Sequence, residues 1–119
     1  MDSILIHDMR VEARIGVYEW EKHLPQTVRL DLVIAVPSPL PFQTGRIADA
    51  LDYASVVARI RAFAADAPPP LVERFAEKVA QIVLAEFGAP WVKVRVAKLG
   101  VIAGVREIGI EIERGTRPG

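Results

Sequence analysis

The residues of this chain that could carry chemistry are few. Three of them, Tyr53, Glu73 and Lys98, lie near the ends of predicted elements, and a fourth, Glu21, lies in a predicted connection. Lys98 is the most informative, because it continues the alternation of the valines at positions 92, 94 and 96 and so points to their apolar face. A lysine that faces a core is unfavourable unless it is paired or useful. If the strand has already ended, the side chain instead reaches water, and the spacing leaves both interpretations open.

The other three residues also have both a structural and a chemical interpretation. Glu73 lies in the first turn of a predicted helix, where the helix dipole favours a carboxylate, and it could also accept two parallel hydrogen bonds from a guanidine-like edge. Tyr53 opens an earlier helix, where it either packs against the helix start or stacks on a flat ring and moves a proton. Glu21 lies in a charged connection, and taken alone it is interpreted as a solvated charge.

Composition excludes several classes of function. Fifteen Lys and Arg residues balance fifteen Asp and Glu residues, so no net charge favours nucleic acid or an anionic membrane. The chain has no cysteine, which excludes disulfides and thiol catalysis and fits a reducing cytoplasm. Only His7 and His23 offer imidazole, in no spacing typical of a metal site, and we expect neither metal nor cofactor. Met1-Asp2-Ser3 is followed by no long apolar run, so we expect no signal peptide and no membrane span.

Two strands are predicted in the first part of the chain. Between Ile4 and Ile15 the apolar residues alternate, but their parity slips near His7-Asp8, which predicts a strand with a bulge. The residues from Val28 to Val36 alternate cleanly as a second strand, and Gly16 to Gln26 form a long charged hairpin connection. Prolines at positions 37, 39 and 41 end the second strand, and a loop is expected to about position 50.

Two helices and two more strands are predicted in the second part. Asp52 is a good N-cap for a helix with apolar residues at helical spacing. Three prolines at positions 68 to 70 end that helix. The next helix carries an apolar stripe from Leu71 to Phe87 and closes at Gly88. Residues 92–96 and 108–112 alternate as the third and fourth strands.

The order strand, strand, helix, helix, strand, strand predicts an α+β fold. Short separations within each strand pair favour hairpins, and hence a four-stranded antiparallel sheet with two helices on one face. We expect a single domain over residues 1–119 with a disordered tail at 115–119. A sheet covered on one face has two free edges, which are a liability unless other subunits pair with them. An oligomer that closes several sheets into a barrel would remove these edges.

Four segments resemble the signatures of the dihydroneopterin aldolase family. They are Ile15-Gly16-Val17-Tyr18-Glu19-Trp20-Glu21, Leu51-Asp52-Tyr53 followed by Val56, Leu71-Val72-Glu73-Arg74, and Val96-Ala97-Lys98 followed by Gly100. All four stand in order at familiar separations, and the resemblance runs from about Ile4 to Gly115. The chain departs from the family at Leu99, where proline is usual, and leucine would place the loop after Lys98 less rigidly.

This resemblance implies a tunnelling-fold subunit. Four subunits would close a β-barrel ring, and two rings would stack into a homo-octamer with active sites at the subunit contacts. It also implies a cytoplasmic lyase of folate biosynthesis that cleaves 7,8-dihydroneopterin into 6-hydroxymethyl-7,8-dihydropterin and glycolaldehyde. The small-molecule partner would be a pterin. The dihydropterin carries its own C=N bond as an electron sink, so the implied cleavage uses neither a zinc ion nor a lysine Schiff base.

The resemblance also implies residue roles: catalysis by Lys98, Tyr53 and Glu21, and substrate binding by Glu73, Val72, Tyr53, Glu21 and Leu51. Glu73 and the Val72 backbone would anchor the guanidine-like edge of the pterin. Tyr53, donated by a neighbouring subunit, would cover the ring and assist proton transfer. Lys98 would be the general acid/base, acting through a water that Glu21 holds.

Two alternative functions stay open at this point. A related epimerase inverts the 2′ carbon of dihydroneopterin triphosphate by cleavage and re-addition, and the aldolase could also epimerise there. Binding of the triphosphate needs cations, which Lys22 and His23 near Glu21 could supply. The third interpretation is a non-catalytic pterin-binding oligomer, which only the departure at Leu99 favours. The presence of all four polar residues argues against it.

Overall fold

The structure is a computed structural model that describes all residues from 1 to 119. Its strands and long helices follow in the order β1 (Ser3–Ala13), β2 (Gln26–Ala35), α2 (Tyr53–Ala65), α3 (Val72–Phe87), β3 (Trp91–Ile102) and β4 (Val105–Gly115). The connections hold three short helical turns: η1 (Glu19–Lys22), α1 (Leu40–Thr44) and η2 (Ile47–Asp49). The predicted α+β order of strands and long helices is confirmed.

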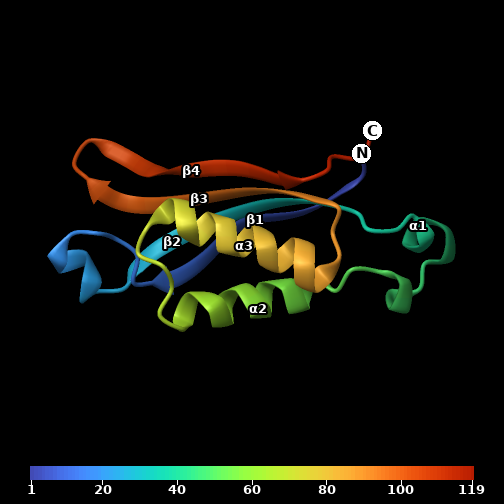
Figure 1. The fold of residues 1–119 in the computed structure, drawn as a ribbon, viewed down its shortest axis with the longest axis horizontal. Helices are drawn as coiled ribbons and strands as arrows, with labels where there is room; N and C mark the ends of the chain where they lie inside the picture. Colours follow the sequence, from blue (N-terminus) through green and yellow to red (C-terminus); the bar gives the residue numbers. More distant parts are fainter.

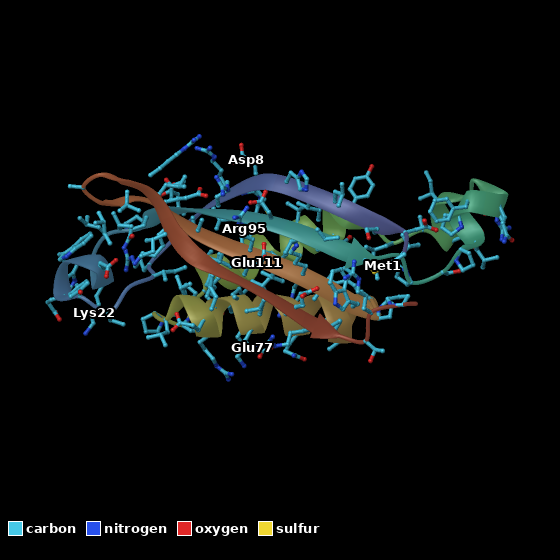
Figure 2. The ribbon with its side chains drawn as sticks, turned by 90° about the horizontal axis from the view of Figure 1, so that it is seen from above. Met1, Asp8, Lys22, Glu77, Arg95 and Glu111 are labelled. Atoms are coloured by element: carbon cyan, nitrogen blue, oxygen red, sulfur yellow. The ribbon has the colours of Figure 1, made fainter.

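The four strands form one sheet in the order β1-β2-β3-β4, with every neighbouring pair antiparallel. Helices α2 and α3 cover the same face of this sheet (Figure 1). Between the two layers lies an apolar core to which alternate residues of β2 contribute fully buried side chains, among them Val28, Leu30, Leu32 and Ile34. The other face is charged. Figure 2 views it from above, with Arg95 of β3 and Glu111 of β4 near its middle.

The bulge predicted in β1 is confirmed. The register of β1 against β2 shifts between Ile6 and Met9, and Asp8 adopts a φ of 53° at that point. The Asp8 backbone N–H donates to Asp31 Oδ1 at 2.8 Å, so β2 supplies a partner for the group that the bulge removes from the ladder. The bulge at Asp8 therefore explains why the alternation of apolar residues in β1 changes phase.

Both predicted helix caps are also present. Asp52 accepts a hydrogen bond from the Ser55 backbone N–H at 3.1 Å, and Gly88 ends α3 with a φ of 70°. The expected loop before α2 differs, because it contains α1 and η2. A proline ends a strand and also suits the first turn of a helix, so the prolines at positions 39 and 41 are compatible with both structures.

The subunit is elongated, with principal extents of 50 × 26 × 19 Å. Turn η1, the start of α3 and the β3–β4 hairpin lie at one end, whereas α1 and η2 lie at the other and α2 begins on the side toward them (Figure 1). Strands β1 and β4 form the two edges of the sheet. After β4, the Thr116 N–H donates to the Pro90 carbonyl at 2.9 Å. No helix combines the length and the apolar character needed to cross a membrane.

Candidate active site

Lys98 and Glu21 meet at the end of the subunit that carries η1. Lys98 is paired with Val28 of β2, so it lies on the helix-covered face, as its parity predicted. Its Nζ donates to Glu21 Oε2 at 2.5 Å, and the two side chains are 14% and 3% exposed. The interpretation in which the strand ends before Lys98 is wrong, because β3 continues to Ile102.

Glu21 is the one charged residue buried in the subunit, at 2% exposure, so its interpretation as a solvated charge is wrong. Besides Lys98, its carboxylate accepts from the Tyr18 backbone N–H at 3.3 Å and from Gln26 Nε2 at 3.0 Å. Burial acts to raise the pKa of Glu21, but the hydrogen bonds from Lys98, Gln26 and Tyr18 outweigh it and lower this pKa overall. Glu21 is therefore ionised at neutral pH.

Gly16 fits against the Glu21 side chain where no other residue would. Its φ is +143°, and a Cβ there would lie 2.3 Å from Glu21 Cδ. The Gly16 N–H donates to the Pro70 carbonyl at 2.8 Å, just before α3 begins. The hairpin connection that carries Glu21 is thereby tied to the start of α3.

Val72 and Glu73 are the first two residues of α3, and the Glu73 side chain is exposed. This helix start lies at the same end of the subunit as η1 and the β3–β4 hairpin (Figure 1). The first N–H groups of a helix have no partner within the helix. One chain thus offers the Lys98–Glu21 pair and a helix start with a carboxylate at the same end.

Tyr53 and Leu51 lie elsewhere. Tyr53 is the first residue of α2, which begins on the side of the subunit away from η1 and toward α1 and η2 (Figure 1), and it is 64% exposed. Leu51 is half-buried, two residues before it. A single subunit therefore brings together Glu21, Lys98, Val72 and Glu73 at one end, but not Tyr53 and Leu51.

The segment after Lys98 is a strand and not the loop expected there. Leu99 is half-buried and opposes Glu107 of β4, and the register becomes irregular only between Leu99 and Ile102. The departure from the family pattern at Leu99 therefore leaves Lys98 within a continuous ladder.

Lys22 and His23, which were considered for binding the triphosphate, both contact the carboxylate of Glu19. Lys22 Nζ lies 3.5 Å from Glu19 Oε2, and His23 Nε2 lies 3.3 Å from Glu19 Oε1. No group of three or more His, Asp or Glu side chains is placed so that it could hold a metal ion.

Gln26 also belongs to this site, because its side-chain amide donates to the Glu21 carboxylate. The sequence alone did not single it out. In the sequence it stands at the end of the predicted hairpin connection, where no periodicity indicates which way a side chain points. The first signature segment ends at Glu21, so the resemblance offered no signal for this residue either.

Comparisons with known proteins match the chain to one enzyme family over nearly its whole length. The family model for dihydroneopterin aldolase matches residues 4–113. The curated dihydroneopterin aldolase of Escherichia coli K12 is 36% identical over 115 residues, which cover 97% of this chain and 94% of the relative. A solved structure of the E. coli enzyme in complex with neopterin has a TM-score of 0.91 at 36% identity, covering 97% of this chain and 100% of that one. A Vibrio cholerae structure assigned to the same activity has a TM-score of 0.93 at 35% identity, covering 98% of each chain.

Proposed function

This chain belongs to the dihydroneopterin aldolase family, and we propose that it cleaves 7,8-dihydroneopterin into 6-hydroxymethyl-7,8-dihydropterin and glycolaldehyde, as a lyase of folate biosynthesis. The observation that carries this proposal is the contact between Lys98 and Glu21, with Nζ and Oε2 2.5 Å apart. It places a proton-carrying group beside a fixed carboxylate at the subunit end where α3 begins. Membership of the family indicates the reaction, and the Lys98–Glu21 pair provides groups that can transfer the protons of this reaction.

The proposed cleavage breaks the bond between the first and second carbons of the pterin side chain. The hydroxyl on the second carbon loses its proton, and that carbon leaves as the aldehyde of glycolaldehyde. The electron pair of the broken bond moves into the C=N bond of the dihydropterin and forms an enamine. A proton then adds to the first carbon and gives the hydroxymethyl product. The substrate is its own electron sink, so the protein has to orient the ring and move two protons.

Lys98 moves these protons as the general acid/base, acting through a water. Glu21, ionised and held by three donors, positions Lys98 and that water or the hydroxyls of the substrate. The contact between the two side chains and their burial support these roles. No metal and no cofactor take part in the proposed reaction.

Glu73 and the Val72 backbone anchor the pterin ring. An exposed carboxylate in the first turn of α3 can accept two parallel hydrogen bonds from the amino group and the neighbouring ring N–H. The binding of neopterin by the E. coli relative supports a pterin ligand for this chain. The ring would lie between the start of α3 and the Lys98–Glu21 pair.

Tyr53 and Leu51 reach this ring from a neighbouring subunit. They lie away from the subunit end that carries η1, on the side of the molecule toward α1 and η2 (Figure 1), so we propose that they complete the site of another copy. We propose rings of four subunits that close a β-barrel and stack in pairs as a homo-octamer. The free edges of β1 and β4 support this assembly, and so does Ile47, which lies six positions before Tyr53 in the chain and is 92% exposed. The whole chain acts as one domain of a cytoplasmic enzyme.

Incubation of the purified protein with 7,8-dihydroneopterin, and separately with its triphosphate, tests the activity. Chromatographic separation of the pterins should show 6-hydroxymethyl-7,8-dihydropterin from the first substrate, together with glycolaldehyde. Some epimerisation at the 2′ carbon is compatible with the same site, because re-addition reverses the cleavage. Epimerisation of the triphosphate without cleavage of dihydroneopterin would instead identify the epimerase. Pterin binding without turnover of either substrate would identify a non-catalytic oligomer.

A further inference from the structure

We infer that Gln26 is a positioning residue of this site, whose side-chain amide holds Glu21 Oε2 against Lys98 Nζ. This inference rests on the proposed function, since it concerns how the proton-moving pair is kept in place. Gln26 is the first residue of β2, and Glu21 lies five positions earlier in the hairpin connection. The contact therefore joins the first residue of β2 to the connection that precedes this strand.

Both hydrogens of the Gln26 amide are used. Nε2 donates to the Ile15 carbonyl at 2.7 Å and to Glu21 Oε2 at 3.0 Å. An amide nitrogen has two N–H groups, so these two acceptors fix the plane of the amide. The backbone anchor at Ile15 directly precedes Gly16, which packs against Glu21. The amide is thus bonded both to the backbone two residues after β1 and to the carboxylate.

The two donors that meet at one oxygen come from different strands. Lys98 of β3 and Gln26 of β2 both donate to Oε2, whereas Oε1 accepts from the Tyr18 backbone N–H. Lys98 is the one charged group in contact with the carboxylate. Without the amide, Oε2 would keep a single donor on a flexible side chain, and the carboxylate could turn away from its present plane. Gln26 therefore fixes the orientation of Glu21 and, through it, the place of the Lys98 ammonium.

The amide oxygen of Gln26 indicates that this side chain acts mainly as a hydrogen-bond donor. Gln26 Oε1 is buried without a hydrogen-bond partner in the chain. A buried acceptor left unpaired is unfavourable, so an amide here stabilises the fold less than a fully bonded one would. What the amide adds at this position is its pair of N–H groups, one of which contacts Glu21. This pattern fits a residue that positions a functional group.

Two substitutions of Gln26 separate positioning from folding. Gln26→Leu removes both N–H groups, so the burial of Glu21 is opposed by fewer hydrogen bonds and its pKa rises. Gln26→Glu keeps the shape but donates only while the new carboxyl is protonated, and once ionised it repels Glu21. Gln81→Leu is the matched control, because Gln81 Nε2 donates to Glu77 Oε2 at 3.1 Å on the exposed surface of α3.

Single-turnover rates and pterin affinity should be measured for the parent and the three variants across about pH 4 to pH 8. We expect Gln26→Leu to lower the rate between about tenfold and a hundredfold while the Kd for a product-like pterin stays within about twofold. The loss of single-turnover rate in Gln26→Leu should be greatest at acidic pH. In Gln26→Glu the loss of rate should instead grow as the pH rises. Gln81→Leu should match the parent throughout.

The inference is overturned if Gln26→Leu keeps the parent rate, or if both Gln26 variants show the same pH-independent deficit. Thermal unfolding of each variant identifies a loss caused by misfolding, and Gln26→Glu supplies the test if Gln26→Leu does not fold. A ¹³C NMR titration of the Glu21 carboxyl gives a readout independent of activity, in which Gln26→Leu should raise its pKa. An unchanged carboxyl titration contradicts the inference. A parent protein that leaves dihydroneopterin intact contradicts the proposed function instead.

Discussion

Lys98 Nζ and Glu21 Oε2 lie 2.5 Å apart, although 77 positions separate the two residues in the chain. The contact joins the third strand of the sheet to a turn between the first two strands. Both side chains are largely buried, so solvent screens the pair less than it screens a surface ion pair. The fold thus holds one ammonium and one carboxylate together at the subunit end where α3 begins.

Gly16→Ala should disturb the site without removing any of its polar groups. The new Cβ would lie 2.3 Å from Glu21 Cδ and 2.5 Å from Glu21 Cβ, so the carboxylate and its backbone must shift. We expect a loss of about 1–3 kcal/mol in the free energy of unfolding and a clear loss of turnover. Urea unfolding and an aldolase assay measure the two effects.

Gly88→Ala is the control for Gly16→Ala, because Gly88 also has a positive φ but nothing lies within 4 Å of its added Cβ. It should lose about 1 kcal/mol of stability and keep the parent turnover. Equal turnover in both variants would show that contact with Gly16 does not set the position of Glu21.

The ionisation of Glu21 predicts how stability depends on pH. Its pKa lies below the ordinary value of 4.5, so the folded state binds fewer protons here than the unfolded state. Its contribution to stability is therefore complete above pH 4.5 and is lost as the pH falls through the lowered pKa. Unfolding should be followed from about pH 7 to pH 3 at fixed protein concentration, for the parent and Glu21→Gln. The free energy of unfolding of Glu21→Gln should fall less steeply with decreasing pH than that of the parent. Identical slopes would show that Glu21 does not have a lowered pKa in the folded state.

Activity should survive exhaustive treatment with a chelator, and borohydride added with substrate should trap no covalent adduct. The reason is that, in the proposed mechanism, the C=N bond of the dihydropterin accepts the electrons of the broken bond in place of zinc or a Schiff base. Assays before and after chelation, with mass spectrometry of the borohydride-treated protein, check both statements. Loss of activity that zinc restores would contradict this mechanism.

The assembly should be an octamer in which each site needs two subunits. Light scattering at micromolar concentration measures the state of the parent. Tyr53→Phe and Lys98→Ala should each lose activity alone. When the two proteins are dissociated and reassembled together, part of the activity should return, because some subunit contacts then combine an intact Tyr53 with an intact Lys98. A stable and active monomer would rule out the shared site.

Local signals in the sequence predicted much of this fold. The parity slip at Asp8, the cap at Asp52 and the terminal Gly88 each act within a few residues, so each could be predicted from its neighbours alone. The parity of Lys98 also predicted its face correctly. The extent of β3 to Ile102 was missed, because Leu99 and Gly100 interrupt the alternation that marks a strand.

The burial of Glu21 could not be predicted in the same way. The hairpin connection has no periodicity, and the group that neutralises Glu21 is on a strand 77 positions away. The contact between Gln26 and Glu21 depends on the same tertiary arrangement. Reasoning from the sequence therefore identified residue types for chemistry, whereas the structure shows which of them meet.

Glu73→Gln should reduce pterin affinity more than the chemical rate. The amide replaces one acceptor oxygen with a donor and sets an N–H group against the N–H groups of the ring. Loss of a charged, bidentate contact should weaken binding by about 2–4 kcal/mol. Fluorescence titration with a product-like pterin measures this loss. Parent-like affinity would show that Glu73 does not hold the ring.

The most direct test of the central claim is Lys98→Ala, measured for pterin affinity and for single-turnover rate in the same preparation. In the proposed mechanism Lys98 moves protons and does not bind the ring, so the Kd should stay within about twofold of the parent. The single-turnover rate should fall about a hundredfold or more, as expected for the loss of a general acid/base. A variant that loses pterin binding but keeps its chemical rate would contradict the account.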